Sequence, residues 1–233
     1  MYILSVDSST RYCSVAIHQD GEQIFSADNF TEKSASSYLT VLIQTAVDAT
    51  GIALTNIDAF AVGKGPGSYT GLRVATSVVK GLCFALNKPL IGVNTLQAMS
   101  QQVADDLHAA GKLIIDGDLW LVPMIDARRM EVYTAVYDRY GREVEETYPL
   151  IVEQGSFDPL FESHKLVFFG DGASKCQPLW KDHPQAIFWE KVIHPRAVEV
   201  GKIASRRYEQ NEFEDVATFE PFYLKEFIGK PVV

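Results

Sequence analysis

The sequence predicts an α/β protein in which one arrangement of strands and helices occurs twice, giving two lobes that each hold a mixed sheet covered by helices. Three observations support this prediction. The chain has 233 residues, enough for one large domain or two smaller ones. Short apolar runs typical of buried strands alternate with longer helical runs. The order of these runs in residues 1–110 recurs in residues 111–233, so we expect one lobe from each half.

The composition is that of a globular protein, with 47% hydrophobic and 22% charged residues. The formal net charge is −9, whereas proteins that bind nucleic acid directly usually carry a basic face. Direct binding of RNA or DNA is therefore not expected. The N-terminal residues lack the features of a signal peptide, no apolar run approaches the length of a membrane span, and the three cysteines lie far apart. We expect a cytoplasmic protein with reduced thiols and no membrane association.

Three short strands and an amphipathic helix open the first half. The strands are predicted at residues 2–6, 13–18 and 23–27. The helix is predicted at 32–50 and ends at Gly51. Its apolar face consists of residues spaced by three and four positions: Leu39, Leu42, Ile43, Ala46 and Val47. Tyr38, Val41 and Thr45 lie to one side of this face and widen it.

A glycine-rich turn follows, between a predicted strand at 59–62 and a predicted helix at 72–86. The turn contains Gly63, Gly65, Gly67 and Gly71. Glycine adopts positive φ and lets another backbone approach closely, and Ser68 or Thr70 can cap the helix. Because free N–H groups at the start of a helix can bind phosphate, two interpretations remain open: a phosphate-binding turn and a tight structural turn.

The helix at 72–86 is apolar or small on every side except at Arg73 and Lys80. Such a helix must be buried on every side, so the face away from the sheet needs a second helix, another subunit, or both. A strand at 89–93 and a helix at 95–110 complete the first unit, and residues 111–118 are expected to connect the two units.

The second half repeats this order. The predicted elements are strands at 121–125, 132–137, 166–169 and 186–189, helices ending at Trp180 and spanning 195–208, and a final loop at 220–225. Asp126 ends the first of these strands, as Asp7 ends the first strand of the chain. The turn 170–173 repeats the glycine-rich turn. Tandem units of this kind characterise the actin, Hsp70 and sugar-kinase superfamily (the ASKHA fold), and we predict that fold.

Proteins of that superfamily hold phosphate with the turn between their first two strands. Here the turn is Asp7, Ser8, Ser9 and Thr10, with Asp7 where a carboxylate would face magnesium. The alternative is an acidic strand end capped by its own hydroxyl groups. No P-loop string is present. No cofactor is predicted.

The sequence also lacks the spacing patterns of a metal-binding histidine pair and of a nucleophilic serine. The five histidines are His18, His108, His164, His183 and His194. No two of them are spaced i, i+3 or i, i+4, so no metal site is predicted. Ser68 lacks the flanking glycines of a nucleophile elbow. The sequence therefore favours a binding or scaffold role, and we predict no catalytic residue.

Five strings, in this order along nearly the whole chain, carry a family resemblance. They are 6–16 (VDSSTRYCSVA), 63–73 (GKGPGSYTGLR), 91–96 (IGVNTL), 125–133 (IDARRMEVY) and 220–225 (EPFYLK). Together they resemble the TsaB family of bacteria, formerly called YeaZ.

The resemblance implies a part in making threonylcarbamoyladenosine beside the anticodon of tRNAs that read codons starting with A. In that pathway TsaC makes threonylcarbamoyl-adenylate, TsaD transfers the group to tRNA, TsaE is a small ATPase, and TsaB is the non-catalytic subunit that TsaD requires. TsaD proteins carry a metal-binding histidine pair, and Thr95 and Met99 stand at those positions here. The resemblance thus implies a protein that is not an enzyme, and that meets tRNA only through the complex.

The resemblance also implies a docking surface on the two long helices of the first half, which pairs with TsaD or, without TsaD, with a second copy. The candidate contacts are Tyr38, Val41, Leu42 and Thr45 on the first helix and Val74, Val78, Lys80 and Leu82 on the second. One departure is Ser34, where many family members have histidine. Two other functions remain as alternatives: a nucleotide-binding kinase or ATPase-like enzyme of the same fold, and a metal-dependent peptidase, which the lack of paired histidines disfavours.

Overall fold

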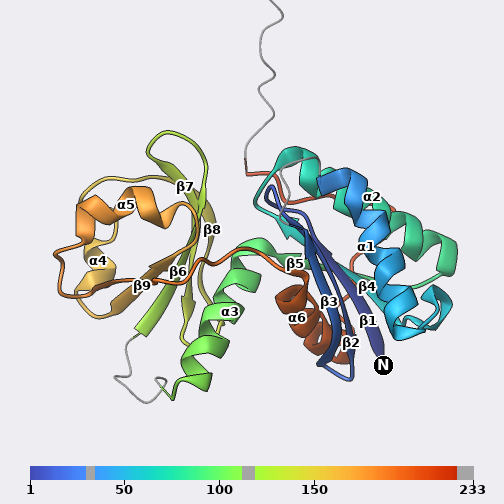
Figure 1. Cartoon of the computed structure of the whole chain (residues 1–233). Helices are drawn as coiled ribbons and strands as arrows, with labels where there is room; N and C mark the ends of the chain where they lie inside the picture. The colour runs from blue at the N-terminus through green and yellow to red at the C-terminus, as the bar shows by residue number, and fades with distance from the viewer. Residues whose placement is uncertain (30–34, 112–118, 225–233) are drawn as a thin grey trace, which may run out of the picture.

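The computed structural model describes residues 1–29, 35–111 and 119–224. Two lobes lie side by side, and each is built on one five-stranded sheet (Figure 1). Among the described residues, every helix falls short of the length and apolarity needed to cross a bilayer. Ser34 lies outside the described residues.

The first sheet has the strand order β3-β2-β1-β4-β5. Its strands are β1 (Tyr2–Asp7), β2 (Cys13–Gln19), β3 (Glu22–Asn29), β4 (Ala59–Gly65) and β5 (Leu90–Asn94). The first three strands are antiparallel neighbours, whereas β4 and β5 run parallel to β1. Both the three-strand opening and the two later strands agree with the sequence prediction.

The second sheet repeats this topology, with the order β8-β7-β6-β9-β10 when it is read from its antiparallel edge. Its strands are β6 (Leu119–Asp126), β7 (Glu131–Asp138), β8 (Glu143–Ile151), β9 (Lys165–Phe169) and β10 (Ala186–Phe188). Each strand has a counterpart in the first sheet with the same pairing. The duplicated fold of two mixed-sheet lobes is therefore confirmed.

Seven helical segments cover the sheets in the described part of the chain. They are α1 (Ala35–Thr50), the 3₁₀ segment η1 (Leu54–Asn56), α2 (Tyr69–Leu86), α3 (Thr95–Ala109), α4 (Asp158–Phe161), α5 (Ala173–Trp180) and α6 (Ala197–Glu209). Sequence analysis had placed neither β8 nor α4, although the repeat requires both. The start of α2 is three residues earlier than expected, because the Ser68 side chain caps the helix and accepts a hydrogen bond from the Gly71 N–H.

Alternating side chains of the first sheet enter two separate cores. On one face, Leu4 and Val6 pack with residues of α1 and α2. On the opposite face, Ile3 packs with Ala98 of α3 and with Val200 of α6. This period of two is what a strand buried on both faces requires. The second sheet has the same arrangement, with α4 and α5 on one face and α3 on the other.

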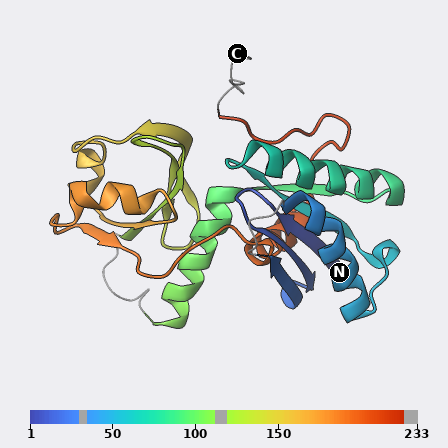
Figure 2. The ribbon, with the colours of Figure 1, turned by 45° about the horizontal axis from the view of Figure 1, so that its top comes forward.

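The two halves of the chain exchange one helix each. Helix α3 follows the first sheet in sequence and contacts β4 and β5 of that sheet, but it also packs against β6 and β7 of the second. Helix α6 follows the second sheet and packs against β1 and β2 of the first. Figures 1 and 2 show both helices between the lobes, where they contact each other. The division into domains at residues 110 and 111 stays a prediction, and this exchange holds the halves together.

Candidate functional site

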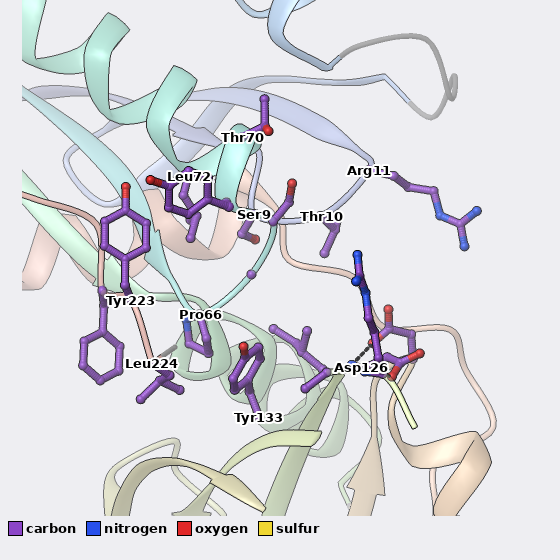
Figure 3. A pocket seen from close by; sticks show the side chains of 18 of the residues that line it. Ser9, Thr10, Arg11, Pro66, Thr70, Leu72, Asp126, Tyr133, Tyr223 and Leu224 are labelled. Atoms are coloured by element: carbon purple, nitrogen blue, oxygen red, sulfur yellow. Dashed lines mark hydrogen bonds between the residues drawn. The ribbon is translucent and has the colours of Figure 1, made fainter. Parts of the chain in front are cut away.

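A cleft of about 690 Å³ lies between the lobes. The first lobe contributes residues 9–12, the turn that precedes α2, and residues 222–224. The second lobe contributes the turn after β6, together with Tyr133 and Asp171. Figure 3 shows side chains from both lobes facing this space, including Thr10 and Pro66 from one lobe and Asp126 and Tyr133 from the other. The cleft therefore joins turns that are distant in sequence.

The predicted phosphate-facing turn is packed tightly against the glycine-rich turn. The Ser8 hydroxyl donates to the Gly71 carbonyl oxygen at 2.7 Å, and the Ser68 N–H donates to the Ser9 carbonyl oxygen at 2.6 Å. A Cβ atom added at Gly67 or Gly71 would overlap the backbone of this turn. These glycines are required for close approach, so the structural interpretation of the turn has a definite physical basis.

Asp7 is buried beneath this contact and is not available to the cleft. Only 1% of the residue is exposed, and its Oδ1 accepts hydrogen bonds from the Ser9 N–H at 3.0 Å and the Ser9 hydroxyl at 2.8 Å. The other oxygen faces Gly63 and has no partner among the described residues. Burial raises the pKa of Asp7 to about 6, although the hydrogen bonds from Ser9 oppose that rise. Of the predicted turn, Ser9 and Thr10 line the cleft.

The equivalent aspartate of the second lobe has the opposite environment. The Asp126 side chain is 48% exposed and forms an ion pair with Lys175. Its Oδ1 also accepts a hydrogen bond from the Arg128 N–H at 2.8 Å. Burial opposes ionisation, but the hydrogen bonds from Lys175 and Arg128 outweigh burial and lower the pKa of Asp126. The duplicated turn therefore holds one carboxyl group that is hard to ionise and one that is easy to ionise.

The second-lobe turn also carries two arginines in the left-handed region. The φ values are 72° at Arg128 and 48° at Arg129, a conformation that costs non-glycine residues about 1–3 kcal/mol each. Hydrogen bonds hold the turn in place, from the Glu131 N–H to the Arg128 carbonyl oxygen and from the Ala127 N–H to the Glu131 carbonyl oxygen, both at 3.1 Å. Arg128 lines the cleft. Sequence analysis did not identify this turn as part of a cleft, because nothing local indicates that it faces the first lobe.

Residues after α6 return to the first lobe and form one wall of the cleft. We call residues 214–224 the C-terminal strap. The Phe222 N–H donates to the Lys64 carbonyl oxygen at 2.7 Å, and Tyr223 packs on Tyr69 with ring centroids 5.1 Å apart. Lys80 fixes the middle of the strap, since its ammonium group donates to the carbonyl oxygens of Ala217 at 3.1 Å and Phe219 at 2.8 Å. The strap thus connects the flank of α2 to the cleft.

The described residues form no cluster of side chains suited to a metal ion. Within the described residues, no three His, Cys, Asp or Glu side chains come together to hold a metal ion. Thr95 and Met99 are buried at the start of α3, where the Met99 methyl group lies against Gly170 of the second lobe. Their surroundings are those of a packed core between the lobes.

The predicted docking residues divide by exposure. Tyr38, Val41 and Thr45 are exposed on the outer side of α1, whereas Leu42 is half-buried. On α2, Val74, Val78 and Leu82 are half-buried against the core that α1 shares with this helix, and Lys80 is held by the strap. These eight residues stay a prediction as a partner surface.

The expectation that α2 is covered on every side does not hold within one chain. One side is buried through Leu72, Ala75 and Val79, but Phe84 is 85% exposed on another side. Phe84 was absent from the predicted contacts. Its sequence signal was present, since it belongs to the run of apolar residues that made this helix unusual.

Comparisons with known proteins agree with this architecture. The family model of TsaD, described as tRNA N6-adenosine threonylcarbamoyltransferase, matches residues 29–155. TsaB from Escherichia coli K12, a tRNA threonylcarbamoyladenosine biosynthesis protein, is 29% identical over 231 residues, which cover 97% of this chain and 95% of that protein.

Solved structures give the same answer for the fold. YeaZ from Pseudomonas aeruginosa is 26% identical, with a TM-score of 0.74 and coverage of 96% of this chain and 99% of that one. The Lmo2764 protein from Listeria monocytogenes, described as a candidate N-acetylmannosamine kinase, shares only the fold: it is 10% identical, with a TM-score of 0.51 and coverage of 91% and 100%. The chain therefore belongs to the TsaB (YeaZ) family, within the wider group that the TsaD family model describes.

Proposed function

We propose that this chain is a non-catalytic scaffold subunit in the synthesis of threonylcarbamoyladenosine on tRNA, required by TsaD and acting with TsaE. The observation that carries the proposal is the similarity to TsaB over nearly the whole length of both proteins. Its partner surface is the outer side of α1 and α2. In this proposal a second copy of the chain occupies that surface when TsaD is absent, and tRNA is met only through the complex.

Exposed apolar side chains on these helices support the choice of surface. Tyr38 and Val41 are 43% and 56% exposed on α1, and Phe84 is 85% exposed on α2. The core beneath them is complete, because Leu39, Ile43 and Val79 are already buried against the sheet. The outer residues therefore contribute little to folding and are available to bury apolar area against a partner helix pair.

Two substitutions test the surface. Val41→Glu and Phe84→Glu each place an unpaired charge in the proposed interface, which should weaken TsaD binding at least about 100-fold while the fold is retained. Ile151→Glu is the matched control, since Ile151 is 68% exposed on β8 of the other lobe. Calorimetry measures TsaD binding, light scattering measures the homodimer, and circular dichroism measures folding. Unchanged TsaD affinity in both α1 and α2 variants contradicts the proposed surface.

A transfer assay tests the absence of catalysis. Threonylcarbamoyl transfer to tRNA is measured with this chain, TsaD and TsaE, and again with each protein omitted. We expect transfer only when TsaD is present and a strong reduction when this chain is left out. Transfer by this chain alone would contradict the non-catalytic role.

The cleft is the observation that favours the second candidate, a nucleotide-binding kinase or ATPase-like enzyme. Both strand-end turns reach it, as they do in the sugar-kinase plan. The burial of Asp7, and the use of the Ser8 hydroxyl and the Ser9 carbonyl oxygen in hydrogen bonds within the protein, weigh against a magnesium-dependent reaction at that turn. Calorimetry with ATP and magnesium decides between the two, because micromolar binding together with turnover would favour the enzyme.

A further inference from the structure

Helix α6 closes the first sheet through a largely apolar interface, with hydrogen bonds to the sheet at the N-terminal end of the helix. Val200, Ile203 and Ala204 pack on the apolar face of the sheet. At the N-terminal end, the Ala197 N–H donates to the Ser14 hydroxyl at 2.8 Å, and the Ser5 hydroxyl donates to the Ala197 carbonyl oxygen at 2.7 Å. These bonds fix the first turn of α6 on strands of the other half of the chain.

Glu199 lies in this interface without a cation of its own. Only 7% of the residue is exposed, and its Oε2 has no hydrogen-bond partner in the described structure. Two other carboxylates are nearby, and each of them holds a neighbouring cation. Arg196 donates to Asp28 of β3 at 3.0 Å, and Lys202 donates to both oxygens of Asp105 of α3 at 2.8 Å.

The polar side chains that meet the first turns of α6 from β1 and β2 are Ser5, Ser14 and His18, and none of these three is charged near pH 7. From β2, His18 lies against the backbone of Gly201, and burial followed by the nearby Lys202 lowers the pKa of His18 to about 4, so this ring is neutral near pH 7. From β1 comes the Ser5 hydroxyl, and from β4 and β5 come apolar side chains. An ionised Glu199 would therefore be a buried and poorly paired charge.

We propose that α6 is a proton-dependent clasp, which closes the first sheet most firmly when Glu199 carries a proton and loosens when that carboxyl group ionises. The cost of ionisation comes mainly from burial, which outweighs the attraction of Arg196, and the carboxylates of Asp105 and Asp28 add to it. Opening of the helix lets water reach Glu199 and removes this cost.

The protonation equilibrium places the transition near neutral pH. Burial raises the pKa of Glu199 to about 7 from its usual 4.5; a backbone hydrogen bond and the nearby Arg196 oppose this rise, and the charges of Asp105 and Asp28 add to it. Between these two values the closed state binds more protons than the open state, so stability of the clasp falls as pH rises. With these two pKa values, the opening equilibrium constant should increase roughly tenfold from pH 6 to pH 8.

Loosening of the clasp would also weaken the contact between the two lobes. The same helix donates hydrogen bonds to α3, which covers the second sheet, from Lys202 to Asp105, from Arg207 to Gln97 at 3.0 Å, and from Arg206 to Gln101. When α6 lifts, these bonds are lost with it. The clasp thus sets how firmly the lobes are joined, and it makes the joint sensitive to pH.

Hydrogen exchange of the α6 amides in the whole chain tests the proposal. After correction for intrinsic exchange rates, protection should fall roughly tenfold from pH 6 to pH 8 in the original protein. Glu199→Gln should change less than twofold over that range. Glu209→Gln is the matched control, because Glu209 is the exposed last residue of α6, and it should behave like the original protein.

Equal pH dependence in the original protein and in Glu199→Gln would overturn the proposal. If Glu199→Gln fails to fold, carboxyl-carbon NMR of the unmodified chain gives an independent answer. A titration midpoint for Glu199 near pH 7 supports the clasp, and a midpoint below pH 5 rejects it.

Discussion

The two glycines of α2 provide a matched test of the packing between the strand-end turn and the glycine-rich turn. Gly71 and Gly81 lie in the same helix, and neither has a positive φ that would disfavour alanine. A Cβ atom at Gly71 would overlap the Ser8 carbonyl oxygen and approach its carbon to 3.1 Å. A Cβ atom at Gly81 would have no other atom within 4 Å. The same substitution should therefore have opposite effects at the two positions.

The magnitudes follow from these surroundings. Gly71→Ala forces backbone apart, which costs about 1–3 kcal/mol, and it breaks or strains the hydrogen bond from Ser8, which costs about 1–3 kcal/mol more because both groups are buried. The better helix propensity of alanine returns about 1 kcal/mol. We expect Gly71→Ala to lower the free energy of unfolding by about 1–5 kcal/mol and Gly81→Ala to raise it by up to about 1 kcal/mol.

Urea unfolding, followed by fluorescence at one protein concentration and pH, measures both variants against the original chain. The difference between the two variants matters more than either value, because helix propensity contributes equally to both. If Gly71→Ala proves as stable as Gly81→Ala, the close packing of the two turns is not a source of stability, and the structural role assigned to these glycines is wrong.

Two further predictions concern Lys80 and Asp7. Lys80→Met removes two hydrogen bonds to the strap, so limited proteolysis should cleave residues 214–224 faster than in the original chain. Lys88→Met, just beyond α2, is the control and should leave the cleavage rate unchanged. Equal cleavage rates in all three proteins would show that Lys80 does not hold the strap. The pKa of Asp7 is raised from 3.8 to about 6 by burial, so the folded state binds a proton more tightly than the unfolded state and loses about 2 kcal/mol of stability as pH rises from 4 to 6. Asp7→Asn should remove most of that loss in unfolding experiments at pH 4 and pH 6.5, and an unchanged pH dependence would mean that Asp7 is not buried in this way.

Periodicity and repetition predicted most of the fold. The apolar run in residues 2–6 and the helical spacing from Leu39 to Val47 are local signals, and both matched the structure. Strand β8 was not placed, because it is an edge strand with exposed Glu143, Val144 and Glu146, and its sequence lacks a clear apolar face. Exposure to solvent removes the pattern on which sequence-based assignment of strands depends.

Tertiary contacts determine the surroundings of several side chains that the sequence alone does not predict. Asp7 and Asp126 follow similar strands, yet one is buried without a cation and the other is paired with Lys175. Lys80 was predicted to meet a partner, but residues more than a hundred positions away hold its ammonium group. Such partners are distant in sequence, and no local spacing indicates them.

The exchange of α3 and α6 between the halves has a consequence for synthesis on the ribosome. The first sheet is complete once β5 has been made, but the part of its second face that α6 covers stays exposed until α6 is made more than a hundred residues later. At about 5–20 residues per second, this interval is on the order of ten seconds. During that time Ile3, Ile91 and Val93 lack the cover that Val200, Ile203 and Ala204 later provide, so nascent chains should be vulnerable to aggregation and to chaperone capture until α6 has been made.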